Sequence, residues 1–218
     1  EAIPESNDYM VASAMGTWSA TANTAGGCPN FPDTWTNNPQ IRLTTSVGGS
    51  IGVGILSINL PEAELKKLQA EHEKLEQSND VESMLSIGLV VLPIAEADTG
   101  KGAGDKPALQ KRLTSVALAG KVAIDPEQIV AKSAMVMGAE EQATVLIDLP
   151  PGPGSYLVVP CTFYPGQECP FTLTIYHADP KLVLTPLKGV RLPPPDKQGK
   201  GKKQKGVKMG PPVSKHDV

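Results

Sequence analysis

The stretch Phe171-Thr172-Leu173-Thr174-Ile175-Tyr176 alternates apolar and hydroxyl-bearing side chains without a break. Successive side chains of a β-strand point to opposite faces, so Phe171, Leu173 and Ile175 would face a core while the threonines face water. One buried and one solvated face is typical of an antiparallel sheet. The stretch therefore predicts an all-β body built from antiparallel strands.

Short apolar runs separated by Gly and Pro recur along the first 187 residues, which favours a β-sandwich. The segment Pro150-Pro151-Gly152-Pro153-Gly154 separates two of these runs. Three φ angles fixed by proline beside two permissive glycines predict a turn, and we expect the flanking strands to pair. The candidate strands are residues 17–20, 40–45, 51–59, 84–93, 113–119, 145–149, 155–159 and 171–176.

One segment, PEAELKKLQAEHEKLEQ at residues 61–77, breaks this pattern because it is rich in strong helix formers and begins with proline. Leu65, Leu68 and Leu75 form a narrow apolar stripe with His72 between them. The stripe can lie on the helix's own domain or bind a partner helix. We favour the first, because two heptads alone rarely sustain a coiled coil. We expect His72 to be an exposed or half-buried packing residue. A shorter helical turn is predicted at Asp125-Pro126-Glu127.

The composition is that of a globular protein, with 40% hydrophobic and 20% charged residues among 218, and it argues against whole-chain disorder and membrane spans. Residues 188–218 carry nine Lys or Arg and two Asp, a net of +7, which leaves −10 on residues 1–187 because the total is −3. This Lys-, Pro- and Gly-rich tail is expected to be disordered.

The tail has two interpretations: a solubilising terminus, or an arm that contacts an acidic surface such as an anionic membrane. Nucleic acid is an unlikely partner because no aromatic residue is interleaved for base stacking. The lysines that would make the acidic-surface contact are Lys200, Lys202, Lys203, Lys205 and Lys208.

Three cysteines, Cys28, Cys161 and Cys169, give an odd count at low density, which is typical of a reducing compartment. We therefore expect an intracellular protein, cytoplasmic or associated with the cytoskeleton. No secretory signal is visible, and the sequence begins at Glu1, which favours a piece of a longer polypeptide over a processed N-terminus.

Several blocks of residues, taken in order along the chain, form one set of motifs. The first blocks are Gly16-Thr17-Trp18-Ser19, Ala25-Gly26-Gly27-Cys28 and Asn30-Phe31-Pro32-Asp33-Thr34-Trp35-Thr36-Asn37-Asn38-Pro39-Gln40-Ile41. The later blocks are Ser86-Ile87-Gly88-Leu89-Val90-Val91, Leu149-Pro150-Pro151-Gly152, Tyr156-Leu157-Val158-Val159-Pro160-Cys161-Thr162-Phe163 and Phe171-Thr172-Leu173. Together these blocks resemble the calpain-type β-sandwich, the C2-like domain III of the calpain cysteine proteases. We therefore expect a sandwich domain over residues 1–187, with a helical insert at about 61–77 that is an addition to the family pattern, followed by the tail.

The resemblance also implies that this chain carries no catalytic core, because the Cys-His-Asn constellation of calpains lies in domains that precede the sandwich. We interpret Cys28 as a small buried hydrophobe. We do not expect Cys161 and His177 to form a catalytic pair, because no further residue is evident that would orient the histidine. The motif residues with an expected structural role are Trp18, Gly26, Gly27, Cys28, Asn30, Pro32, Asp33, Trp35, Asn38, Pro39, Pro151, Gly152, Tyr156, Pro160 and Phe163.

No cofactor is expected. The family's acidic loop, linked to calcium and phospholipid, is replaced by the helical segment, and Asp33, Asp98, Asp105 and Asp179 are not clustered in the sequence. Two functions stay open: a non-catalytic module that docks to protein or acidic membrane surfaces or acts as a scaffold, or the C-terminal regulatory domain of a calpain-like cysteine endopeptidase. The corresponding partners are a protein or a calpain-like protease core.

Overall fold

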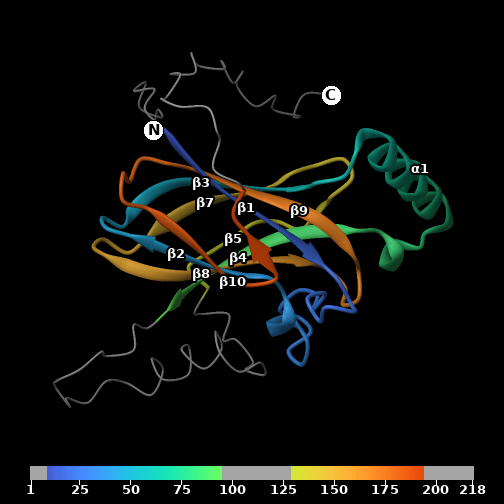
Figure 1. The fold of residues 1–218 in the computed structure, drawn as a ribbon. Helices are drawn as coiled ribbons and strands as arrows, with labels where there is room; N and C mark the ends of the chain where they lie inside the picture. The colour runs from blue at the N-terminus through green and yellow to red at the C-terminus, as the bar shows by residue number, and fades with distance from the viewer. Residues whose placement is uncertain (1–8, 95–128, 194–218) are drawn as a thin grey trace, which may run out of the picture. The chain divides into compact units, whose positions relative to one another are not determined.

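The chain folds into two antiparallel sheets that pack face to face, as expected for a β-sandwich (Figure 1). The computed structural model describes residues 9–94 and 129–193. The five-stranded sheet has the order β11 (Val190–Arg191), β1 (Met10–Trp18), β9 (Cys169–His177), β3 (Gly49–Ile58), β7 (Ala143–Leu149). The six-stranded sheet has the order β10 (Val183–Lys188), β2 (Gln40–Thr45), β8 (Gly154–Thr162), β4 (Ser86–Ile94), β5 (Ala131–Lys132), and β6 (Val136–Met137) also pairs with β4.

Strand β9 confirms the alternation from which the fold was predicted. Phe171, Leu173 and Ile175 are fully buried between the sheets, whereas Tyr176 on the opposite face is 42% exposed. The Trp18 ring lies 4.5 Å from that of Phe171, centroid to centroid, and its Nε1 donates a hydrogen bond to the Pro160 carbonyl of the other sheet at 3.1 Å. Trp18 therefore joins the two layers through both its ring and its N–H.

The expected pairing of the strands on either side of the Pro150–Gly154 turn is wrong, because the two strands belong to different layers. β7 pairs with β3, and β8 lies between β2 and β4. The burial patterns explain this: β7 alternates buried and exposed positions, whereas β8 is buried from Ser155 to Thr162 and needs cover on both faces. The turn, which carries Gly152 at a φ of 106°, crosses between the sheets and donates from the Gly152 N–H to the Val47 carbonyl at 2.7 Å.

The outer face of the six-stranded sheet is covered by the loop that follows β1. A second apolar cluster forms there, outside the core between the sheets, and Trp35 of the short helix η1 (Trp35–Asn37) is its largest member. Trp35 is therefore buried on the outer side of β8 and β4, and Trp18 is the indole between the sheets. The buried members of this cluster are Cys28, Trp35, Val90, Leu92, Leu157, Val159 and Cys161.

Other boundaries differ from those expected. The first strand extends over Met10–Trp18, and β10 and β11 were not predicted. β11 pairs with β1 through Val190 and Gly16, so the sheet includes residues that were assigned to the tail. The strand predicted at 113–119 and the helical turn predicted at 125–127 lie outside the described residues.

The predicted helix is present as α1 (Glu62–Ser78) and lies at one end of the sandwich (Figure 1). It ends at Asn79, which adopts the left-handed conformation with φ of 58° and is followed by the short helix η2 (Val81–Ser83). No helix among the described residues is long and apolar enough to cross a membrane.

Candidate functional site

Helix α1 lies on its own domain, which was the favoured interpretation of its leucine stripe. Leu65, Leu68 and Leu75 are half-buried, and Leu68 packs against the central core. Gln69 Nε2 donates a hydrogen bond to the Ala139 carbonyl at 2.8 Å. The face proposed for a partner therefore contacts the sandwich.

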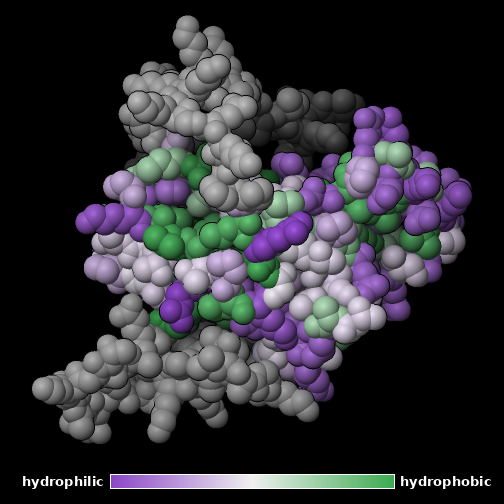
Figure 2. All heavy atoms as spheres, in the orientation of Figure 1, coloured by the Kyte–Doolittle hydropathy of each residue, from purple (hydrophilic) through white to green (hydrophobic). Residues whose placement is uncertain are grey.

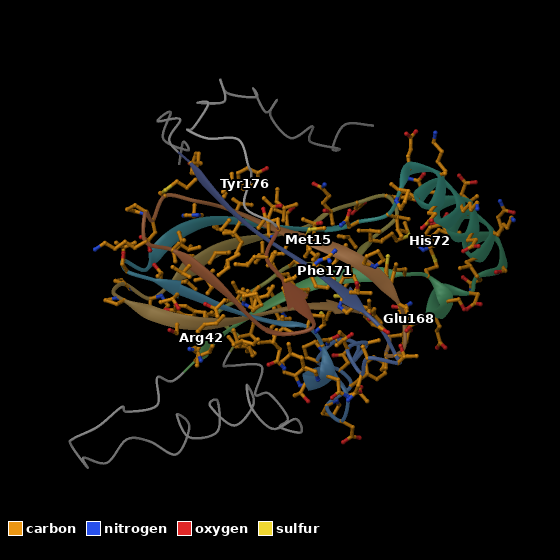
Figure 3. All side chains as sticks on the ribbon, in the orientation of Figure 1. Met15, Arg42, His72, Glu168, Phe171 and Tyr176 are labelled. Atoms are coloured by element: carbon orange, nitrogen blue, oxygen red, sulfur yellow. The ribbon has the colours of Figure 1, made fainter. Side chains whose placement is uncertain are left out.

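His72 is buried, with 1% of its surface exposed, so the expectation of an exposed or half-buried residue is wrong. Its Nε2 accepts a hydrogen bond from the Leu85 N–H at 3.1 Å, which fixes the neutral tautomer with the proton on Nδ1 (Figure 3). Burial lowers the pKa of His72, although the carboxylates of Glu140, Glu71 and Glu76 act in the opposite direction. The imidazole is a structural acceptor between α1 and β4.

The side chain of Asn38, which is fully buried, makes three hydrogen bonds within the motif loop before β2. Its Oδ1 accepts from the Gly26 N–H at 3.1 Å, and its Nδ2 donates to the carbonyls of Gly27 at 2.6 Å and Trp35 at 2.8 Å. Gly27 has a φ of 77°, and a Cβ on Gly26 would lie 2.2 Å from the Thr34 carbonyl oxygen. The expected structural roles of the two glycines and of Asn38 are thus explained by backbone geometry.

The other motif residues divide between the interior and the surface. Cys28 is 4% exposed and its N–H bonds the Phe163 carbonyl at 3.0 Å. Burial raises the pKa of Tyr156. Pro39 and Pro160 are also buried, Gly152 and Phe163 are intermediate, and Asn30, Pro32, Asp33 and Pro151 are exposed.

Cys161 and His177 do not form a catalytic pair, because they lie on β8 and β9 in different layers. Burial, with a smaller contribution from nearby Cys28, raises the pKa of the Cys161 thiol to about 12. Burial, with a smaller contribution from Glu64, raises that of Cys169 to about 12 as well. The reactive species is the thiolate, so both thiols are poor nucleophiles at neutral pH.

We therefore expect Cys161 and Cys169 to resist iodoacetamide at pH 8 in the folded chain. A thiol with a pKa near 12 is ionised in about one molecule in 10,000 at that pH, and burial also blocks access. Intact mass spectrometry should find these two residues unmodified in buffer and fully alkylated in urea. Rapid labelling of either residue in the folded chain would contradict the burial described above.

Asp179 is an isolated carboxylate, as the sequence suggested, but it organises two loops. It accepts hydrogen bonds from the Thr45 hydroxyl at 2.8 Å, the Ser46 N–H at 2.8 Å, the Ser46 hydroxyl at 2.9 Å and the Lys181 N–H at 2.8 Å. Burial alone would raise the pKa of Asp179, but these four bonds outweigh it and hold the pKa well below its usual range. The carboxylate is therefore engaged by protein donors.

Within residues 9–94 and 129–193, no group of three His, Cys, Asp or Glu side chains is arranged to hold a metal ion. Asp33 is exposed on the motif loop, and Asp98 and Asp105 lie outside the described residues. The absence of a cofactor stays a prediction. Lys200, Lys202, Lys203, Lys205 and Lys208 also lie outside the described residues, so their contact with an acidic surface stays a prediction too.

The surface that the sequence analysis missed is the outer face of the five-stranded sheet. Four residues in register cross it from β1 to β7: Val11 is opposite Tyr176, Tyr176 opposite Val53, and Val53 opposite Leu146. Val11 is 56% exposed, Tyr176 42% and Leu146 61%, and Val53 is half-buried. We call these four residues the apolar row.

The apolar row is surrounded mainly by uncharged side chains. Met15 on β1 and Ile55 on β3 extend it, and the intervening outward positions hold threonine and serine. Across the five strands the charged residues on this face are Asp148, near one end of β7, and Arg191 of β11, which lies opposite Met15. We call this surface the outer sheet face. Met15 and Tyr176 are labelled in Figure 3. Figure 2 shows that hydrophobic side chains reach the molecular surface in a band.

An apolar row on a face with so few charges suits contact with another protein surface. Strand alternation contained part of the signal, because Leu146 occupies an outward position of a predicted strand. Val11 carried no such signal, since β1 was predicted to start at residue 17.

Comparison with known proteins agrees with the motif blocks. A family model described as "Calpain large subunit, domain III" matches residues 14–176. "Calpain clp-4" of Caenorhabditis elegans is 27% identical over 176 residues, which cover 81% of this chain and 21% of that protein. The chain thus spans about a fifth of the length of the relative it matches.

Proposed function

Because the chain belongs to the calpain large subunit domain III family, we propose that it is a non-catalytic regulatory module that docks onto a protein partner through its outer sheet face. The observation that supports this most is the apolar row on four neighbouring strands. At about 4.8 Å between strands, the row extends roughly 14 Å, which is the scale of the central patch of a small interface.

The proposed docking surface differs from the one suggested by the sequence. The leucines of α1 contact the sandwich, and the polar side of that helix carries mixed charges, of which the Lys66–Glu62 pair is joined at 2.7 Å. An exposed pair of this kind contributes little binding energy. The outer sheet face instead offers exposed apolar side chains that can be buried without removing charges from water.

We expect the docking to be lost when charges are placed on the outer sheet face. Full-length tagged chain, added to an extract of the source cells, should elute from a sizing column in a complex larger than itself. The double variant Val11→Lys/Tyr176→Lys should elute alone, because two buried lysines without partners would oppose association. Val183→Lys is the matched control, since Val183 is 53% exposed on β10 of the other sheet.

Elution of the unsubstituted chain alone would contradict the docking proposal. So would a double variant that keeps the complex. Loss of the complex with Val183→Lys as well would show that the outer sheet face is not the specific site.

The basic tail would supply a second, weaker contact to an acidic surface, and joining two contacts in one chain raises the overall affinity. Replacing Lys200, Lys202, Lys203, Lys205 and Lys208 with glutamine should weaken binding to phosphatidylserine vesicles and reduce its salt dependence. Equal vesicle binding by the variant would support the solubilising interpretation.

We also propose an intracellular site of action, since the three described thiols are free and buried.

A second function is favoured by the length of the relative. The chain matches about a fifth of a calpain, so it would also suit the C-terminal regulatory domain of a calpain-like cysteine endopeptidase whose catalytic core is elsewhere in the polypeptide. An antibody to the tail and intact mass spectrometry of the captured native polypeptide distinguish the two functions. A species near 22.9 kDa supports an independent module, and one heavier by tens of kilodaltons supports the protease domain.

A further inference from the structure

Strand β7 is a long edge strand with no feature that blocks further pairing. It has seven residues, ATVLIDL, without proline, glycine or lysine, and it pairs with β3 on one side. In the part of the chain that the structure describes, no strand pairs with its other side, although β5 of the other layer lies close by. Such an edge offers unpaired backbone N–H and C=O groups to another strand.

The other sheet edges are protected in ways that β7 is not. β11 and β5 have two residues each, and β10 contains Pro186 and an irregular register between Pro186 and Lys188. Short strands, proline and bulges are the usual devices that prevent strand addition. Among the strands that end the two described sheets, β7 is therefore the longest and the one without such a device.

The side chains of β7 are self-complementary about Leu146. We propose that β7 pairs antiparallel with β7 of a second copy of this chain, with the two-fold axis at Leu146. Leu146 then faces Leu146 of the second copy, and Thr144 faces Asp148, so that a hydroxyl can donate to a carboxylate. On the inner face, Val145 is opposite Ile147, and Ala143 is opposite Leu149.

Charge disfavours the registers whose two-fold axis lies two residues away. A shift of the two-fold axis by two residues toward the C-terminus places Asp148 opposite Asp148 of the second copy. The opposite shift places Asp148 opposite Glu140. Like charges directly opposite one another destabilise a strand pair.

The pairing covers an exposed apolar side chain and an exposed strand edge at the same time. It covers Leu146, the most exposed member of the apolar row at 61%, and it gives the edge of β7 hydrogen-bond partners. It also joins the two five-stranded sheets into one, so the apolar rows of both copies become continuous. The inference does not depend on the docking function, because its test contains this chain alone.

Sedimentation equilibrium of the full chain over micromolar to submillimolar concentrations tests the pairing. The apparent mass should rise from 22.9 kDa toward twice that value. Leu146→Lys brings two like charges together at the two-fold axis and should weaken the dimer at least tenfold. Val11→Lys is the matched control, because Val11 is similarly exposed on the same face but lies on β1.

Cross-linking locates the axis independently of dimer strength. Cβ atoms of directly opposed residues in antiparallel strands lie about 4.5–5.5 Å apart, so Leu146→Cys should form a disulfide-linked dimer under mild oxidation. The native cysteines are buried and should not interfere, and Val11→Cys should remain monomeric. A chain that stays monomeric at every concentration, equal weakening by both lysine variants, or equal cross-linking of both cysteine variants would overturn the proposal.

Discussion

Replacing Asn38 with leucine is expected to lower the free energy of unfolding by about 4 kcal/mol, because each buried polar group left without a partner costs about 1–3 kcal/mol. The substitution keeps a similar volume but removes the amide that bonds the Gly26 N–H and the carbonyls of Gly27 and Trp35. The Gly26 N–H and the Gly27 carbonyl would then lose their partner in a site with no exposed surface at Asn38, whereas the Trp35 carbonyl keeps its bond from the Asn38 N–H at 3.1 Å. Urea unfolding followed by circular dichroism measures the loss.

Asn37→Ala is the control for this prediction. Asn37 is half-buried one position earlier, and among the described residues its side chain makes no hydrogen bond. Its substitution should change the free energy of unfolding by less than about 0.5 kcal/mol. Similar small losses for both variants would mean that the Asn38 amide does not hold the motif loop.

Replacing His72 with alanine is expected to lower the free energy of unfolding by about 3 kcal/mol, through a cavity and an unpaired Leu85 N–H. The variant should also change the pH dependence. The folded chain keeps His72 neutral because burial lowers its pKa, whereas the unfolded chain binds a proton below about pH 6.5. The stabilisation from neutral His72 is therefore fully present above pH 6.5 and is lost as the pH falls toward the lower folded pKa.

Urea unfolding at several values between pH 5 and pH 8 tests both parts of the His72 prediction. The unsubstituted chain should lose stability as the pH falls across this range, and the variant should show a smaller slope. Lys74→Ala, an exposed change on the same helix, should keep the original slope. An unchanged slope in His72→Ala would show that His72 is not the titrating group.

The sequence predicted those parts of the fold that short-range patterns determine. The alternation of Phe171–Tyr176 located β9 and its buried face, and helix formers located α1 to within a residue at each end. Gly26, Gly27 and Asn38 were expected to be structural residues, and their contacts lie within the motif loop. In each case the residues themselves carry the physical reason.

The failures concern long-range contacts. A turn sequence such as Pro150–Gly154 reverses the chain equally well within one sheet or between two, so the pairing of β7 and β8 could not be decided locally. The two residues of β11 are held by β1 and have no strand pattern of their own. The burial of His72 depends on Leu85, thirteen residues away, and the apolar row depends on strands from both ends of the chain.

Hydroxyl-radical footprinting tests most directly whether the outer sheet face is the docking surface. Oxidation of Met15 and Tyr176 would be compared in the isolated chain and in the complex recovered from source cells, with half-buried Tyr164 as the internal reference. Our account predicts that Met15 and Tyr176 are several-fold protected in the complex while Tyr164 is unchanged. Equal oxidation of Met15 and Tyr176 in both states would contradict docking through this face.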